Sequence, residues 1–189
     1  MDNETVERNY FRLGINNDAN ELRGFQAGVV NSARDAMGVQ AGGMNCSENL
    51  DGIQVGVINL NNCGVTGIQA GAVNHAGWVK GIQAGAVNYV DGSVRGVQIG
   101  GVNILKSNAG YSKTLKDFQI GVFNTAKRIR GGAQVGLVNL IERMDGVQLG
   151  LVCKASEGDF LQLGALTIRP GSEKWYTRFS PLIGFHTEE

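Results

Sequence analysis

Proline, aromatic residues and excess charge of either sign are scarce in this chain. Two of its 189 residues are proline, 7% are aromatic, and seventeen basic residues balance seventeen acidic ones. Binding to nucleic acid needs a concentrated basic face, so the balanced charge argues against nucleic acid as the main partner. Long apolar runs are missing as well, and no window approaches the length that a transmembrane helix needs.

The sequence contains an odd number of cysteines, which are Cys46, Cys63 and Cys153. They lie at no Cys-x-x-Cys or other metal-ligand spacing, so we expect neither a disulfide framework nor a zinc site. The first eight residues hold no apolar signal core. From the residues alone we therefore expect no export signal.

Catalytic motifs are also missing from the sequence. The glycines between Gly96 and Gly101 are followed by no Gly-Lys-Ser/Thr, which a phosphate-binding loop requires. His75 and His186 form no pattern with a serine or a cysteine, and we expect His75 to be exposed in a turn. The carboxylates lie in the segments that link the repeats, where exposure gives little reason for acid–base catalysis. We therefore expect no enzymatic activity, no cofactor and no metal.

Glycine, by contrast, is abundant and recurs in a tandem repeat. The 29 glycines are about twice the usual share. The repeat unit reads Gly-apolar-Gln-apolar-Gly-x-apolar-Asn and returns every 14 or 15 residues, except for one interval of 21. Such regularity is the sequence signature of a repeat architecture. The glutamines are Gln26, Gln40, Gln54, Gln69, Gln83, Gln98, Gln119, Gln134, Gln148 and Gln162.

Each of these glutamines is followed two residues later by glycine, and eight units carry asparagine three residues further on. In the last two units Cys153 and Thr167 replace the asparagine, and residues 13–24 keep the spacing without the glutamine. We interpret these as degenerate terminal copies. The asparagines are Asn31, Asn45, Asn59, Asn74, Asn88, Asn103, Asn124 and Asn139.

The pattern around the glutamines predicts an all-β fold. Apolar residues, many of them β-branched, flank every glutamine, which is typical of a strand, and the glycines disfavour a helix. The first prediction is a tandem-repeat β-solenoid of about ten coils, each of 14–15 residues. In it the glutamines and asparagines form stacked ladders, and the glycines mark corners or close backbone contacts. The linking segments, such as residues 32–37 and 89–95, are expected to form turns, with a short second strand as the alternative.

An antiparallel β-meander or a closed β-barrel is the alternative architecture. Strands of about ten residues joined by short turns suit an outer-membrane barrel. The few aromatic residues argue against it, because such barrels carry two aromatic girdles. Neither architecture explains why the residue before each asparagine is also apolar, since strict alternation cannot bury it with the others. A membrane partner is expected only with the barrel.

The repeat pattern divides the chain into an N-terminal tail at 1–11, a repeat array at 12–168 and a C-terminal cap at 169–189. The long interval marks an insertion at 104–117. Insertions into repeat arrays form loops on one face and often carry binding function. The candidate interaction residues are Lys106, Tyr111, Lys113 and Lys116 in the insertion and Trp175 and Tyr176 in the cap.

The units at 81–88 and 96–103 resemble those of a family of bacterial surface-repeat proteins built from tandem Gly-φ-Gln-φ-Gly-φ-φ-Asn units. The resemblance covers most of the chain and implies exposure at the cell surface or the outer membrane. It implies no activity, ligand or catalytic residue. We therefore expect a non-catalytic scaffold that presents a rigid surface to an unidentified protein partner. A small outer-membrane β-barrel and a secreted or cytosolic effector are the alternatives.

Overall fold

The computed structural model describes residues 8–106, 117–168 and 179–186, and within them the protein is all-β. The strands form one sheet in the order β1-β2-β3-β4-β5. No helix occurs in the described part of the chain, which confirms the all-β prediction. The strands are β1 (Arg8–Val90), β2 (Val94–Leu105), β3 (Asp117–Glu157), β4 (Phe160–Ile168) and β5 (Phe179–His186).

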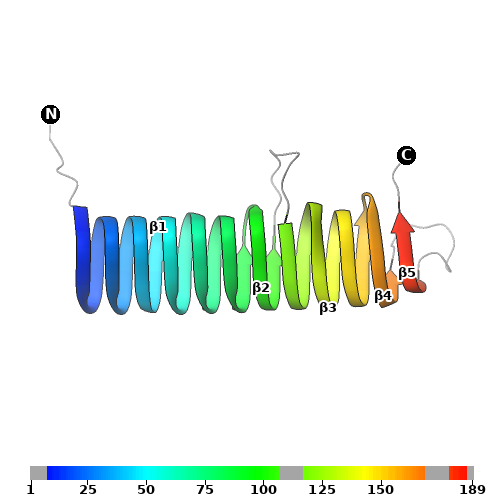
Figure 1. Cartoon of the computed structure of the whole chain (residues 1–189), viewed down its shortest axis with the longest axis horizontal. Coiled ribbons are helices and arrows are strands. Elements are labelled where there is room, and N and C mark those ends of the chain that lie inside the picture. The colour runs from blue at the N-terminus through cyan, green and yellow to red at the C-terminus, as the bar shows by residue number, and fades with distance from the viewer. Residues whose placement is uncertain (1–7, 107–116, 169–178, 187–189) are drawn as a thin grey trace, which may run out of the picture.

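Successive repeats lie side by side along one long axis. Figure 1 shows the ribbon winding around this axis turn after turn, with the start of β1 and β5 at opposite ends of the molecule. Gln83 pairs with Gln98, and Gln98 pairs with Gln119, so the register is one repeat even across the long interval. Neighbouring repeats thus pair in parallel, whereas the alternative meander requires antiparallel pairs. Each turn of the ribbon is called a coil below.

The linking segments are part of the strands to a larger extent than the sequence predicts. Residues 32–37, predicted as a turn, lie inside β1. The prediction is wrong there because a parallel coil can bend while each residue keeps its hydrogen bonds to the same position of the next coil. Residues 91–93, by contrast, lie outside the strands, between β1 and β2.

The boundaries of the repeat array also differ from the predicted ones. β1 begins at Arg8, within the segment assigned to the tail. β2 continues to Leu105 and β3 begins at Asp117, so residues 104, 105 and 117 belong to coils and not to the insertion. Ile104 pairs with Thr125, which keeps it in the register of the array.

β5 covers the C-terminal edge of the sheet. It pairs antiparallel with β4, with residue 161 opposite residue 185 and residue 163 opposite residue 183. A free strand edge invites pairing with other chains, and this cover protects β4 from it. β5 lies within the segment predicted as a cap, of which residues 169–178 and 187–189 fall outside the described part.

Side-chain amides occupy the interior of the coils. All ten repeat glutamines and all eight repeat asparagines are at most 1% exposed. Aliphatic side chains such as Leu22, Val79 and Met144 share the interior with them. The apolar neighbours of the glutamines point outward instead, and Ile82 is 38% exposed. Because side chains alternate across a strand, burying each glutamine turns both of its neighbours to the outside.

A bend explains the second apolar residue that strict alternation leaves unaccounted for. Unit positions are counted here from the first glycine, so that Gly81 is position 1, Gln83 position 3 and Asn88 position 8. The consecutive residues Ala72 and Val73, at positions 6 and 7, are both exposed. The chain therefore turns a corner between these positions before the asparagine points inward.

The glutamines form a hydrogen-bonded ladder through the interior. Each glutamine from Gln40 to Gln162 donates from Nε2 to Oε1 of the glutamine one coil before it, over 2.6–3.2 Å. Gln69 also donates to the backbone oxygen of His75 in its own coil. The ladder thus satisfies the buried amides and ties neighbouring coils together.

The asparagines form a second ladder that runs in the opposite direction. Asn74 Nδ2 donates to Oδ1 of Asn88, one coil after it, over 2.9 Å. The same Nδ2 donates to the backbone oxygen of Ala84 over 2.9 Å. This pattern repeats from Asn17 to Asn124. Cys153 takes the place of an asparagine, accepting from Asn139 at 3.8 Å.

The two glycines of the unit make room for these contacts. Gly81 at position 1 has φ +145°, a backbone conformation that other residues rarely adopt. At position 5, a Cβ on Gly85 would lie against the carbonyl oxygen of Gly71 and 2.7 Å from Nδ2 of Asn74. The second glycine is therefore required because a backbone carbonyl and the asparagine of the preceding coil occupy that space.

Replacing Gly85 with alanine tests this close contact. We expect Gly85→Ala to lower the free energy of unfolding by about 2 kcal/mol or more, measured by urea denaturation, because the backbone and Asn74 must shift. Gly101→Ala is the matched control, since position 6 carries alanine at Ala72, and it should change the free energy by less than about 0.5 kcal/mol. Equal losses in the two variants would contradict the assignment.

Breaking the glutamine ladder tests its contribution. Gln83→Leu leaves Oε1 of Gln69 and Nε2 of Gln98 without their partners. We expect a loss of about 1–3 kcal/mol for each orphaned group, measured by urea denaturation. A triple variant that replaces Gln69, Gln83 and Gln98 with leucine also leaves ladder groups without partners only at the two ends of the replaced segment. The triple variant should therefore lose much less than three times the single variant, and an additive loss would refute this explanation.

Candidate functional site

The outer rows at unit positions 9 and 11, with the inward-pointing position 10 between them, hold two separate cavities and are called the groove below. The side chain at position 10 points inward, as Ala76 and Val90 do at 0% exposure, so the neighbouring positions point outward on either side of it. Two cavities lie along this groove. The first, of about 410 Å³, is lined by Asp18, Ser32, Arg34, Cys46 and Glu48 among others.

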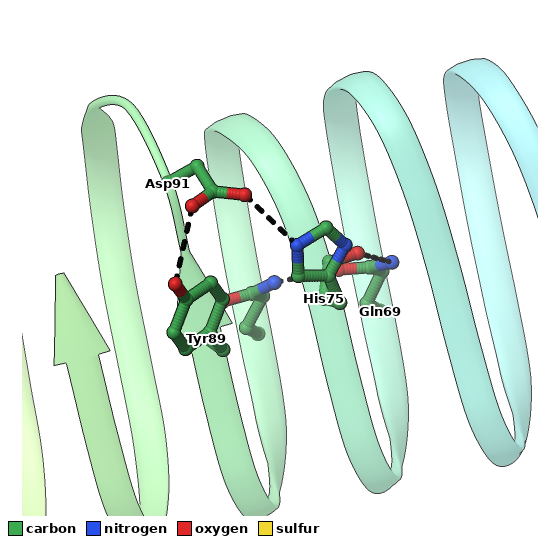
Figure 2. A network of polar contacts seen from close by, with 5 residues as sticks. Gln69, His75, Tyr89 and Asp91 are labelled. Atoms are coloured by element: carbon green, nitrogen blue, oxygen red, sulfur yellow. Dashed lines mark hydrogen bonds and ion pairs between the residues drawn. The ribbon is translucent and has the colours of Figure 1, made fainter. Parts of the chain in front are cut away.

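A cluster of polar contacts lies in the middle of the groove. His75 Nε2 lies 3.0 Å from Oδ2 of Asp91, and the Tyr89 hydroxyl donates to Oδ1 of Asp91 over 3.2 Å. The His75 and Tyr89 rings stack with their centroids 5.3 Å apart. Figure 2 shows His75 and Tyr89 on neighbouring coils, both directed at the Asp91 carboxylate. The contact between His75 and Asp91 crosses from position 9 of one coil to position 11 of the next.

The electrostatics of the cluster follow from these contacts. The hydrogen bond with His75 lowers the pKa of Asp91 from its usual value, and Tyr89 adds to the effect. The Lys106 ammonium lies 6.0 Å from the centroid of the Tyr89 ring, and a hydrogen bond with Tyr89 raises the pKa of Lys106. His75, Tyr89, Asp91 and Lys106 thus form a partly exposed group of polar side chains on the outside of the coils.

The second cavity, of about 310 Å³, begins beside this cluster. Leu105, Ala126 and Ile141 form its buried floor. Lysines stand on both of its sides, together with one carboxylate. Among the described residues, no acidic side chain lies within ion-pair distance of Lys127 or Lys154. The polar side chains of the cavity are Lys106, Thr125, Lys127, Glu142, Lys154 and Ser156.

A third cavity, of about 320 Å³, lies between positions 12 and 14 of the first coils. Trp78 forms one wall of it and is 43% exposed. A Cβ on Gly64 would clash with the Trp78 ring, so the indole packs directly against the backbone of this glycine. The cavity also presents Asp35 and Asp51, which makes its rim acidic.

Of the predicted interaction residues, Lys106 alone falls within the described part of the chain. Lys106 lies in the groove, beside Tyr89 and at the start of the second cavity. Tyr111, Lys113, Lys116, Trp175 and Tyr176 fall outside the described residues. The ladder glutamines and asparagines are buried and bonded to one another, so they have no free group to offer a ligand.

Sequence reasoning missed the cluster around Asp91. The expectation that His75 is exposed in a turn is wrong, because His75 lies within β1 and its side chain is 30% exposed. His75 and Asp91 are 16 residues apart, which is one 14-residue unit plus two positions. Aligning the units on their glutamines brings positions 9 and 11 of neighbouring coils together, and that alignment is the signal that finds this pair.

Asp117 is a buried carboxyl at the point where β3 begins. It is 1% exposed and occupies position 1, where most other units carry glycine. Neither of its carboxyl oxygens has a hydrogen-bond partner in the described part of the structure. Burial raises the pKa of Asp117 from 3.8 to about 7. Such a group stays protonated well above the pH at which an ordinary aspartate ionises.

The described residues contain no group of three or more His, Cys, Asp and Glu side chains placed to hold a metal ion. Cys46, Cys63 and Cys153 are free thiols. A search of the same residues for a helix long and apolar enough to cross a membrane finds none.

Comparisons with known proteins identify no relative. No family model matches the chain, and neither a curated protein nor a solved structure matches it.

The raised pKa of Asp117 predicts a specific pH dependence of stability. Because the folded-state pKa is about 7 and the unfolded value 3.8, the folded state holds a proton that the unfolded state has lost within this window. The free energy of unfolding should therefore fall as the pH rises from 3.8 to about 7, by on the order of 4 kcal/mol from this group. Urea denaturation at a series of pH values measures it.

Asp117→Asn removes the titrating group and should flatten this part of the pH profile. Asp51→Asn, at an exposed position, is the control for the loss of one carboxyl. Superimposable pH profiles for the natural chain and Asp117→Asn would show that Asp117 ionises normally.

Proposed function

We propose that the chain is a β-solenoid of about ten coils, each of 14–15 residues. The parallel, in-register pairing of neighbouring repeats supports this architecture. So do the two amide ladders, in which each coil contacts the identical residues of its neighbours. The antiparallel strand β5 then serves as the cap of the C-terminal end.

The function that this geometry supports best is that of a non-catalytic scaffold presenting a rigid surface to a protein partner. The observation that carries the proposal is the contrast between the uniform interior and the varied groove. Inside, the same glutamine and asparagine recur from coil to coil. At positions 9 and 11 the residues vary along the array and include charged, aromatic, hydroxyl and aliphatic side chains. A rigid interior with a varied outer row is the arrangement of repeat proteins that bind other proteins.

The resemblance of the repeat units to bacterial surface-repeat proteins places this scaffold, within the proposal, at the bacterial cell surface. Pre-organised side chains on a rigid support lose little conformational entropy on binding. The ordered group formed by His75, Tyr89 and Asp91 fits such a role, because ring stacking and two contacts with the Asp91 carboxylate hold its side chains in a fixed geometry.

The test combines the shape of the molecule with the position of its partner. Small-angle X-ray scattering of the monomer, extrapolated to zero protein concentration, should give a rod about 50 Å long, since stacked coils are about 4.8 Å apart. A photo-cross-linking residue at Thr125 in the groove should capture one defined protein from the native cells. The same residue at Lys80, an exposed position outside the groove, should capture none. A rounded particle would overturn the architecture, and equal capture at both positions would overturn the binding surface.

A further inference from the structure

One outer face of the coils carries no polar side chain along its whole length. It consists of positions 2, 4 and 6, which alternate with the buried glutamine and the second glycine and therefore point outward together. In the eleven units that begin at residues 10, 24, 38, 52, 67, 81, 96, 117, 132, 146 and 160, each of these positions is apolar or glycine. This set of residues is called the apolar face below.

The apolar face is exposed as well as apolar. Val29 and Val57 are each 59% exposed, Val122 and Leu151 are each 56% exposed, and Leu137 is 50% exposed. Contiguous apolar surface of this extent on a soluble protein usually marks an interface. The charged residues of the coils lie at other positions, such as Asp91 and Lys106 in the groove, and leave this face uncharged.

Large and small side chains are not mixed evenly along the apolar face. The coils that begin at residues 117, 132 and 146 carry large aliphatic residues at positions 4 and 6 and form a ridge. These residues are Ile120, Val122, Val135, Leu137, Leu149 and Leu151.

The three coils before the ridge carry small residues at the same positions and form a shallow depression. Only Ile99 interrupts it. The small residues are Ala70, Ala72, Ala84, Ala86 and Gly101. A twofold axis between the coils that begin at residues 96 and 117 would place the ridge of one copy on the depression of another, and the depression of the first on the ridge of the second.

We propose that the apolar face binds a second copy of this chain in an antiparallel, twofold-symmetric dimer. The inference rests on the proposed scaffold, because it requires stacked coils with a flat outer face. A second copy has the same spacing between coils, so each of its coils can pack against one coil of the first copy along the whole contact. The ridge and the depression supply the alternation of large and small residues that two packed sheets need.

The size of the contact agrees with a dimer of modest affinity. With the twofold axis at this place, the eight units from Gly52 to Phe160 overlap in both copies. At about 4.8 Å per coil and 3.3 Å per residue, the overlap measures about 38 Å by 13 Å and buries roughly 1,000 Å² in total. Specific interfaces begin near this size, and contacts at this lower end are weak or transient, so we expect a dimer that dissociates on dilution.

Sedimentation velocity of the purified chain tests the proposal directly. At a protein concentration of about 100 μM the natural chain should sediment as a dimer. Leu137→Glu places a carboxylate on the ridge, within the contact and twice per dimer, and should raise the dissociation constant at least about 100-fold. Met37→Glu is the matched control, because Met37 is 45% exposed and lies at position 14, outside the apolar face. Circular dichroism of both variants checks that they fold.

Cross-linking tests the antiparallel arrangement. In a Cys63→Ser background, which removes the exposed thiol, copies carrying Ala84→Cys are mixed with copies carrying Val135→Cys. A short bismaleimide should join them efficiently, because the coils of these two residues face each other across the proposed axis. Copies carrying Ala84→Cys and Val55→Cys should not be joined, since the coil of Val55 faces the one at the other end of the contact.

Three results would overturn the dimer. A natural chain that stays monomeric at about 100 μM has no such contact. Dimers that persist in Leu137→Glu use another face. A monomer that floats with phosphatidylcholine vesicles, and no longer does so with Leu137→Glu, covers the face with lipid. The proposed scaffold function is tested separately, by the rod shape of the monomer and by capture of a partner through Thr125. If both of these hold while the dimer fails, only the dimer proposal is overturned.

Discussion

A buried amide must have partners for its hydrogen-bonding groups, and this requirement governs the rest of the molecule. A glutamine at position 3 can satisfy its donors and its acceptor in the interior if the coils above and below carry glutamine at the same place. The asparagines obey the same condition and also bind the backbone of the neighbouring coil. The condition accounts for three features. It keeps the register across the long interval, contributes to the need for glycine at position 5 and turns the apolar neighbours of the glutamines outward.

The two ladders differ in direction as well as in position. The glutamines donate toward the N-terminus and the asparagines toward the C-terminus. Two aligned rows of amide dipoles therefore oppose each other across the interior, and their fields partly cancel. The cancellation matters because uncompensated rows of this length would leave partial charge at the ends of the array. At the C-terminal end Gln162 Oε1 is buried without a partner in the described residues, which marks the place where the ladder stops.

Much of the fold follows from the sequence, because the repeat period reports the pairing directly. The all-β class follows from spacing and residue type alone, and so does the expectation that the repeat glycines mark corners or close backbone contacts. The direction in which each side chain points does not, since a pattern of alternating amides and aliphatic residues has the same period whichever set is buried. The contact between His75 and Asp91 was missed for a related reason. It joins different positions of neighbouring coils, so it is visible only after the coils are stacked. Asp117 was missed because its burial depends on its neighbours and not on its own residue type.

The sameness of the coils has a consequence for how such a molecule changes during evolution. Each interior coil offers the donors and acceptors on one side that it uses on the other, so a whole unit can be duplicated or deleted without leaving an unmatched amide. Length can thus vary in steps of about 4.8 Å while every face keeps its character. The number of units in the chain therefore determines the length of the molecule.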